Sequence, residues 1–263
     1  MMPVPVAVRA CFVTGTDTEV GKTLVSCALL HAWAQEGLVA VGLKPVAAGA
    51  HEHSGALGQQ GHLVNDDVEQ LRQASSLGLS SQQVSPYVLR APVAPHLAAR
   101  MEGVHLDLPV MVQAYQRLCG LAQAVVVEGV GGFCVPLNDQ HDTSDLAQQL
   151  GLPVVLVVGL RLGCINHALL SAQAIAAKGL RLAAWVANTV DAHMPELQNN
   201  VQAIHERLQA WAPVGQNVVY AGCVPRLSDP LAEPVAKAAA TYLNWSSVDW
   251  SVMDRSVVKR RAT

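Results

Sequence analysis

The sequence predicts an α/β fold, built as a single doubly wound, mainly parallel sheet with helices on both faces. Short runs rich in β-branched residues alternate along the chain with segments of helical character, which is the order expected for strand–helix–strand units. Two of the runs, AQAVVVEGVGG (122–132) and LPVVLVVGL (152–160), are almost uninterrupted in Val and Leu. Such runs are typical of strands that are covered on both faces, as in a parallel sheet.

The individual strands are expected where these apolar runs occur. VAVRACFVTG leads into a glycine-bearing turn, LVAVGLKPV follows the first helix, and the two valine-rich runs come later in the chain. The segments LRLAAWVANT and VVYAGCVP continue the series. The expected strands are therefore 6–15, 38–46, 122–132, 152–160, 180–189 and 218–225.

Helices are expected between the strands. The first, KTLVSCALLHAWAQEG, begins after the turn and is closed by Gly37. The others occupy 66–77, 108–120, 143–150, 165–178, 194–210 and 229–243. The stretch 50–64 is rich in Gly, His and Gln and predicts a surface loop. One domain, residues 1–245, accounts for these elements, and 246–263 is expected to be a tail that is disordered or docked at the periphery.

Composition excludes several classes of protein. Of 263 residues 51% are hydrophobic, and the formal net charge is −3, so a nucleic-acid surface, which needs a strong basic excess, is not indicated. The six cysteines form no C-x-x-C pair. No apolar run reaches the ~18 residues of a membrane span, and the N-terminus has no signal-peptide pattern. We therefore expect a cytoplasmic protein without nucleic-acid or membrane partners.

FVTGTDTEVGKT (12–23) resembles a phosphate-binding loop but departs from the pattern G-x-x-x-x-G-K-[ST] by one residue. Gly21, Lys22 and Thr23 fit, whereas the first glycine is Gly15 and Thr16 stands at its expected place. A loop between a buried strand and a helix exposes free backbone N–H groups to an anion. Lys22 would reach the β- and γ-phosphates, and the Thr23 hydroxyl would coordinate Mg²⁺.

Two acids in this loop have no obvious place beside a polyanion. Asp17 and Glu19 are either solvated carboxylates that face away from the phosphates, or one of them orders the loop by accepting backbone N–H bonds. The spacing does not decide between these interpretations.

Polar residues at the carboxyl ends of the strands are the next candidates, because ligands of parallel α/β sheets bind at that edge. Lys44, Glu128, Asn188 and Pro225 follow four of the expected strands. Glu128 comes after three valines, where an unpaired carboxylate is costly to bury, so a cation is expected beside it. Asp67 lies at the start of a helical run and is either a ligand or, like Asp66, a helix cap.

A second anion site is expected in LRLGCINHA (160–168). Gly163 and Cys164 open a helix directly after a buried strand, which again leaves backbone N–H groups free. Nothing nearby in the sequence identifies a base that would make Cys164 a nucleophile.

These residues together resemble the dethiobiotin synthetases. The resemblance covers most of the chain and is carried by FVTGTDTEVGKT, GLKPVAAG (42–49), SPYVLRAPVAPH (85–96), VVEGVGGFCVPL (126–137), LGCINHA and WVANTV (185–190). It implies a P-loop NTPase fold and an ATP- and Mg²⁺-dependent ligase of biotin biosynthesis. In this family 7,8-diaminopelargonic acid takes up CO₂ as a carbamate, ATP phosphorylates the carbamate, and the second amine closes the ring to dethiobiotin. The enzyme is expected to be a homodimer.

The resemblance also implies roles for individual residues. Thr18, Lys22 and Lys44 would stabilise the carbamate and the transferring phosphoryl group, and Thr23, Asp67 and Glu128 would hold Mg²⁺. The nucleotide would contact Thr16, Asp17, Glu19, Val20, Gly21, Lys22, Thr23, Asn188 and Pro225. The diamine would contact Lys44, Ala48, Glu128 and Gly131. The substrate carboxylate would bind the backbone amides of a second group, contributed by the partner subunit of the dimer: Leu162, Gly163, Cys164 and Asn166.

The chain departs from the family pattern at three positions. Ala48 stands where a serine donor is usual, Arg161 where lysine is common, and Val130 where alanine is common. Two alternative functions remain. A related ATP-dependent amidotransferase would need a glutaminase domain for which the chain has no room. A partition-type switch ATPase would need a trans-acting lysine where Asp17 stands.

Overall fold

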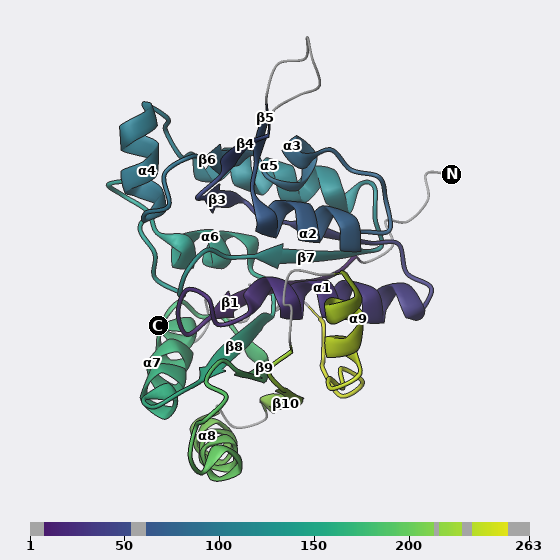
Figure 1. The fold of residues 1–263 in the computed structure, drawn as a ribbon, viewed down its shortest axis with the longest axis vertical. Helices are drawn as coiled ribbons and strands as arrows, with labels where there is room; N and C mark the ends of the chain where they lie inside the picture. Colours follow the sequence, from purple (N-terminus) through teal and green to yellow (C-terminus); the bar gives the residue numbers. More distant parts are fainter. Residues whose placement is uncertain (1–7, 54–61, 213–215, 228–232, 252–263) are drawn as a thin grey trace, which may run out of the picture.

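A computed structural model describes residues 8–53, 62–212, 216–227 and 233–251 (Figure 1). In this part of the chain the central sheet has six strands, all parallel, in the order β10-β9-β8-β1-β7-β2. Its strands are β1 (Arg9–Gly15), β2 (Ala40–Leu43), β7 (Ala124–Glu128), β8 (Val154–Leu160), β9 (Leu182–Thr189) and β10 (Val219–Val224). The sheet confirms the predicted doubly wound fold, and every residue of β7 and β8 is buried.

Helices cover both faces of the sheet. The crossover through α1 (Lys22–Gln35) runs from β1 toward β2, whereas those through α7 (Cys164–Ala177) and α8 (Leu197–Trp211) run the opposite way, from β8 through β9 to β10. Because such crossovers are right-handed, α1 lies on one face and α7 and α8 lie on the other. The remaining long helices are α2 (Asp66–Ala74), α5 (Leu108–Cys119), α6 (Thr143–Leu150) and α9 (Glu233–Ala240), the last packed against α1 (Figure 1).

Two predicted strands were too long: the strand expected over 122–132 is β7, Ala124–Glu128, and the strand expected over 38–46 is divided. Residues 38–46 do not form a single strand, because the chain leaves the central sheet after Leu43. Lys44 N donates instead to the carbonyl of Val84 at 2.8 Å, and Pro45 has no N–H to offer a strand ladder. The chain then enters β3 (Val46–Ala48), which pairs in parallel with β6 (Tyr87–Leu89) outside the central sheet.

Other short elements lay outside the sequence prediction. The expected loop 50–64 contains an antiparallel pair, β4 (His51–His53) and β5 (His62–Val64). Two helices, α3 (Ser81–Val84) and α4 (Pro95–Glu102), were also missed. Local signals for both helices were present, since α3 has a Ser80–Gln83 capping box and α4 opens on Pro95 and closes on Gly103 in the left-handed region.

The described beginning of the C-terminal tail packs onto the domain. Trp250 meets the ring of Trp33 on α1 edge-on, with centroids 5.1 Å apart, and Trp245 and Val248 are buried. Arg181 donates to the carbonyl of Ser251 at 2.6 Å. The N-terminal residues 1–7 and the basic end of the tail, which carried two of the sequence predictions, lie outside the described residues. Within the described ranges no helix is both long and apolar enough to cross a membrane.

Candidate active site

The loop between β1 and α1 closes around the start of the helix. Lys22 is buried, and its Nζ donates to the carbonyl of Asp17 at 2.9 Å. Glu19 and Gly21 adopt left-handed backbone conformations, with φ of 59° and 92°. Helix α1 starts without a side-chain cap and without an acid in its first turn. Its first N–H groups are therefore available to an anion, as the sequence predicted for this loop.

The structure explains why the first glycine of the loop is Gly15 rather than residue 16. A Cβ on Gly15 would lie 2.6 Å from Cγ2 of Val20, and one on Gly159 would lie 2.7 Å from its Cγ1. The Val20 side chain thus fills the space between the ends of β1 and β8, where only glycines leave room. Thr16 needs no such space, and its Oγ1 accepts a hydrogen bond from Gly159 N at 3.4 Å.

One of the two loop acids orders the loop. The Asp17 carboxylate accepts a hydrogen bond from Thr18 N at 2.7 Å and forms an ion pair with Arg161, from the loop after β8. The Thr18 N–H and the Arg161 guanidinium hold the pKa of Asp17 below its usual value, although burial opposes this shift. Of the two interpretations, loop ordering therefore applies to Asp17, whereas Glu19 is exposed.

Lys44 joins two carboxylates at the carboxyl edge of the sheet. Its Nζ lies 2.8 Å from Asp67 Oδ2 and 2.6 Å from Glu128 Oε1. The Thr23 hydroxyl is 2.8 Å from Asp67 Oδ1 and 2.8 Å from Glu128 Oε1 and can donate its proton to one of them. Four of the predicted site residues, from four separate segments, therefore meet in one cluster.

Burial sets the electrostatics of this cluster. Burial opposes the charged form of Lys44, but the carboxylates of Glu128 and Asp67 outweigh it and raise its pKa above the usual value. The same pairing holds the pKa of Asp67 low against the effect of burial. For Lys22 the balance is reversed: burial, reinforced by the positive charge of Lys44, outweighs the carboxylates of Glu128, Asp67 and Asp17 and lowers its pKa to about 8. Lys44 is the cation that the sequence analysis expected beside the buried Glu128.

The oxygen atoms of the cluster suit a hard divalent cation. Thr23, Asp67 and Glu128 supply hydroxyl and carboxylate oxygens, the ligand types that Mg²⁺ prefers. In the described part of the chain the second carboxylate oxygen of Glu128, Oε2, is buried and has no hydrogen-bond partner. An unpaired buried carboxylate oxygen of this kind fits a site that receives a metal ion.

Asn65 was missed in the sequence analysis and corrects one of its alternatives. The Asn65 side chain, and neither Asp66 nor Asp67, caps α2 by accepting from Val68 N at 3.3 Å. The cap leaves Asp67 free to face Lys44. An Asn directly before an acidic helical start is a capping signal that the sequence contained.

The other predicted diamine contacts lie near the loop or on β3. A Cβ on Gly131 would lie 3.5 Å from Thr18 Oγ1, which places this glycine beside the exposed face of the loop. Ala48 ends β3, and its carbonyl accepts from Asn65 Nδ2 at 3.1 Å. Alanine supplies no side-chain donor at this position.

The predicted nucleotide contacts at the far strands are separate from the Lys44 cluster. Asn188 is the penultimate residue of β9, inside the strand rather than after it, and its Nδ2 donates to the carbonyl of Val20 at 2.9 Å. Pro225 directly follows β10. The next residue, Arg226, donates to the carbonyl of Val190 at 2.9 Å and so joins the loops after β9 and β10.

The second predicted anion site begins α7. Gly163 precedes the helix with φ 95° and provides no side-chain cap, and Leu162 is 97% exposed. Asn166 is exposed, whereas Cys164 is buried. The segment thus presents backbone groups and an apolar side chain outward.

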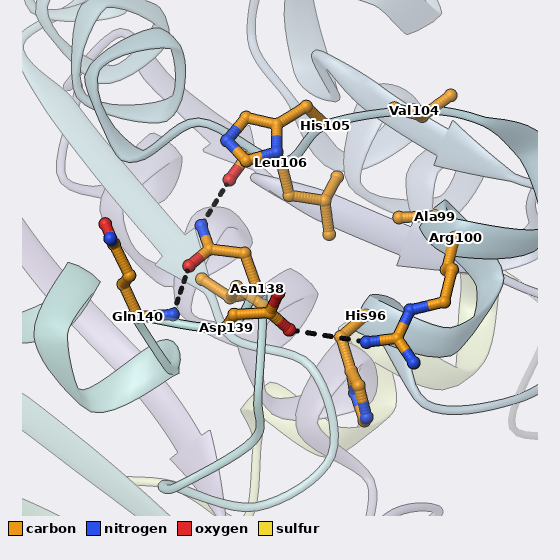
Figure 2. A pocket seen from close by; sticks show the side chains of 10 residues that line it. His96, Ala99, Arg100, Val104, His105, Leu106, Asn138, Asp139 and Gln140 are labelled. Carbon is orange, nitrogen blue, oxygen red and sulfur yellow. Dashed lines mark hydrogen bonds and ion pairs between the residues drawn. The ribbon is translucent and has the colours of Figure 1, made fainter.

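A cavity of about 460 Å³ lies apart from these residues, between α4 and the turn 137–140 (Figure 2). Its charged and amide groups bind one another: Arg100 pairs with Asp139 at 3.3 Å, and Asn138 donates to the carbonyl of Leu106 at 2.8 Å. None of the predicted site residues lines it.

Comparison with known proteins agrees with the features of the site. A family model described as an AAA domain matches residues 9–233. The ATP-dependent dethiobiotin synthetase BioD of Janthinobacterium sp. (strain Marseille) is 52% identical over 236 residues, which cover 90% of this chain and 94% of that protein. The protein of the same name from Ralstonia nicotianae is 51% identical over 234 residues, 89% of this chain and 94% of its own length.

Solved structures are more distant. The septum site-determining protein MinD of Pyrococcus horikoshii, complexed with Mg-ADP, gives a TM-score of 0.48 at 13% identity and covers 88% of this chain and 86% of its own. A ParA family ATPase from Chlorobium tepidum gives 0.48 at 12% identity, with 89% and 91% covered. Likeness at this level carries no information about function.

The relatives at about half identity extend over nearly the whole of both chains, and the family model covers most of this chain. On these grounds, the chain belongs to the family of ATP-dependent dethiobiotin synthetases.

Proposed function

We propose that the protein converts 7,8-diaminopelargonic acid, CO₂ and ATP into dethiobiotin, ADP and phosphate. The observation that carries this proposal is the buried cluster of Lys44, Glu128, Asp67 and Thr23 beside an uncapped phosphate loop. The relatives at about 50% identity are named for this activity. The cluster brings together the charges that a phosphoryl transfer to a small anionic acceptor requires.

The reaction proceeds through three bond changes. One amine of the substrate attacks CO₂ and loses a proton, which gives a carbamate. A carbamate oxygen takes the γ-phosphoryl group of ATP, and ADP leaves. The second amine attacks the carbonyl carbon of this anhydride and loses a proton, phosphate departs, and the ureido ring closes.

Lys22 and Lys44 stabilise the negative charge that these steps create. Both are buried and therefore act in a low dielectric, where a fixed cation is worth more than in water. Lys44 is held in place by its two carboxylates, and Lys22 by the Asp17 carbonyl. Thr18 lies on the exposed side of the loop next to Gly131, where its hydroxyl can reach the carbamate.

A magnesium ion would be held by Thr23, Asp67 and Glu128, and when bound it would neutralise charge on the β- and γ-phosphates. The unpaired Oε2 of Glu128 supports this assignment. When the magnesium ion is bound, Lys44 would stay in contact with the Asp67 and Glu128 carboxylates and orient them.

The nucleotide would extend from the phosphate loop toward the ends of β9 and β10. Its phosphates would contact backbone groups from Thr16 to Thr23, and its base would lie near Asn188 and Pro225. The described cysteines are all unpaired, which suits the reducing cytoplasm that we propose for the reaction.

The substrate carboxylate would bind at the start of α7 in a partner subunit. Helix α7 begins at Cys164, after the N-cap residue Gly163, and has neither a side-chain cap nor an acid in its first turn. The exposed Leu162 and Leu170 give this side of the molecule an apolar surface that a second subunit would cover. If the site is shared between subunits, activity per chain should fall as the protein is diluted below the dimer dissociation constant. Full specific activity of a monomer, measured by sedimentation and product formation at the same concentrations, would contradict this arrangement.

The direct test is to incubate the purified protein with diaminopelargonic acid, bicarbonate, ATP and Mg²⁺. We expect dethiobiotin by mass spectrometry, with one ADP formed per product. ATP hydrolysis without dethiobiotin would point instead to a related ligase or a switch ATPase.

A further inference from the structure

The side chain of Asn188 makes a contact with the phosphate loop itself. Its Nδ2 donates to the carbonyl of Val20 at 2.9 Å, across 168 positions of sequence, and the residue is only 7% exposed. A Cβ on Gly21 would lie 2.2 Å from the same nitrogen. The amide group therefore sits directly against the turn formed by residues 19–21, where the backbone has its two left-handed residues.

The strand register explains how Asn188 reaches that turn. Asn188 is paired with Gly159 on β8, and β8 is the neighbour of β1. Gly159 has no side chain, and a Cβ at this position would lie 2.7 Å from Cγ1 of Val20. The glycine therefore allows the Val20 side chain to pack against the end of β8, beside Asn188. Val20 is thus held from two directions, by the two glycines around its side chain and by the Asn188 amide on its carbonyl.

The hydrogen bond from Asn188 fixes the peptide group between Val20 and Gly21. The carbonyl of Val20 belongs to the peptide that joins Val20 to Gly21, the residue before α1. Fixing this peptide fixes the direction of the N–H groups that follow it. A buried neutral hydrogen bond whose removal leaves one partner unpaired costs the desolvation of that partner as well as the bond.

We propose that Asn188 is a positioning residue for the phosphate loop, which it holds through the Val20 carbonyl in the conformation that receives the phosphates. The inference rests on the proposed binding of nucleotide to this loop. It differs from a role in reading the base, because a residue that shapes the loop supports phosphate binding whatever base is attached.

The test compares ligands with different bases and one with none. Dissociation constants for MgADP, MgGDP, MgCDP and Mg-tripolyphosphate are measured by calorimetry on the wild type, Asn188→Ala and Asn188→Leu. Leucine keeps the approximate shape of asparagine without its donor, and the melting temperature of each ligand-free variant verifies its fold. Thr189→Val, at the next residue of the same strand, is the control.

We expect both Asn188 variants to weaken all four ligands by a common factor of about five to thirty, as the loss of one buried hydrogen bond predicts. The control should bind like the wild type. A loss confined to MgADP would assign Asn188 to the base, and an unchanged affinity for all four would show that the loop holds its shape without it; either result overturns the proposal. Because no diamine is used, the outcome does not depend on whether the protein makes dethiobiotin.

Discussion

Replacing Lys44 by Met should lower both turnover and stability. Lys44 is 2% exposed, and its partner Glu128 is fully buried at 0%. Methionine has a similar length but no charge, so the change leaves the Glu128 carboxylate buried beside Asp67 without its ion-pair partner, with only the more distant charge of Lys22 nearby. Removing one partner of a buried ion pair costs about 3–5 kcal/mol, because the other charge stays unpaired.

The expected loss of stability can be measured directly. For a chain of this size about 2–4 °C of melting temperature corresponds to 1 kcal/mol, so Lys44→Met should melt roughly 6–20 °C below the wild type. Asp67 is 42% exposed and solvated in part, so the magnitude rests on Glu128. Turnover should fall about 100-fold or more, as the loss of a charge that stabilises the transition state does.

A second variant separates the two effects. Lys44→Met combined with Glu128→Gln removes both charges and should recover most of the melting temperature, while turnover stays low. The pair of Lys178 and Asp145, 31% and 27% exposed and outside the cluster, serves as the control, because a partly solvated pair contributes less than a fully buried one. Thermal unfolding without nucleotide and dethiobiotin formation by mass spectrometry are the assays. A melting temperature equal to that of the wild type, or turnover within a few-fold of it, would refute the reasoning.

Three further substitutions test other parts of the site. Gly15→Ala puts a Cβ 2.6 Å from Val20 Cγ2, which costs about 1–3 kcal/mol by overpacking. MgADP binding measured by calorimetry should therefore weaken roughly 5- to 160-fold, whereas normal affinity would show that Val20 can move aside. Arg161→Ala removes the ion-pair partner of the Asp17 carboxylate. Because this pair is exposed, we expect the KM for ATP to rise only about two- to five-fold and to recover in Arg161→Lys. A rise in KM that lysine does not reverse would show that the positive charge at position 161 is not the cause. Ala48→Ser supplies the donor usual in the family and should leave turnover equal or higher, so a large fall in turnover would show that the site is built around alanine.

Much of the site was predictable because its residues are marked by local sequence. Glu128 ends a valine run, Lys44 precedes a proline, and Lys22 and Thr23 follow a glycine at the start of a helix. In a parallel sheet the carboxyl ends of all strands share one edge, so such residues converge whatever the details of the loops. The structure brings Glu128, Lys44 and Thr23 together with Asp67, whereas Lys22 donates to the Asp17 carbonyl.

The short elements were less predictable for a physical reason. Three-residue strands such as β3 and β6 are too brief to show a period, and they form only because they pair with each other across 38 intervening residues of chain, 49–86. The single strand predicted over 38–46 was wrong for the same reason. The apolar run continues from β2 in the central sheet into β3, which belongs to a separate two-stranded sheet. Pairing partners, rather than composition, decide where such strands begin and end.

The sequence by itself determined the parallel sheet, the phosphate loop before α1 and the identity of the charged residues at the sheet edge, since these depend on hydrophobic pattern and on neighbours in the chain. Only the tertiary structure decided which atoms those residues meet. It showed that Gly15 makes room for Val20, that Asn65 rather than Asp67 caps α2, and that Asp17 is paired with Arg161, 144 positions away. The first two contacts lie within a few residues of chain, but the pairing of Asp17 with Arg161 depends on the register of β1 against β8, which brings the loops after these two strands together and which no local pattern encodes.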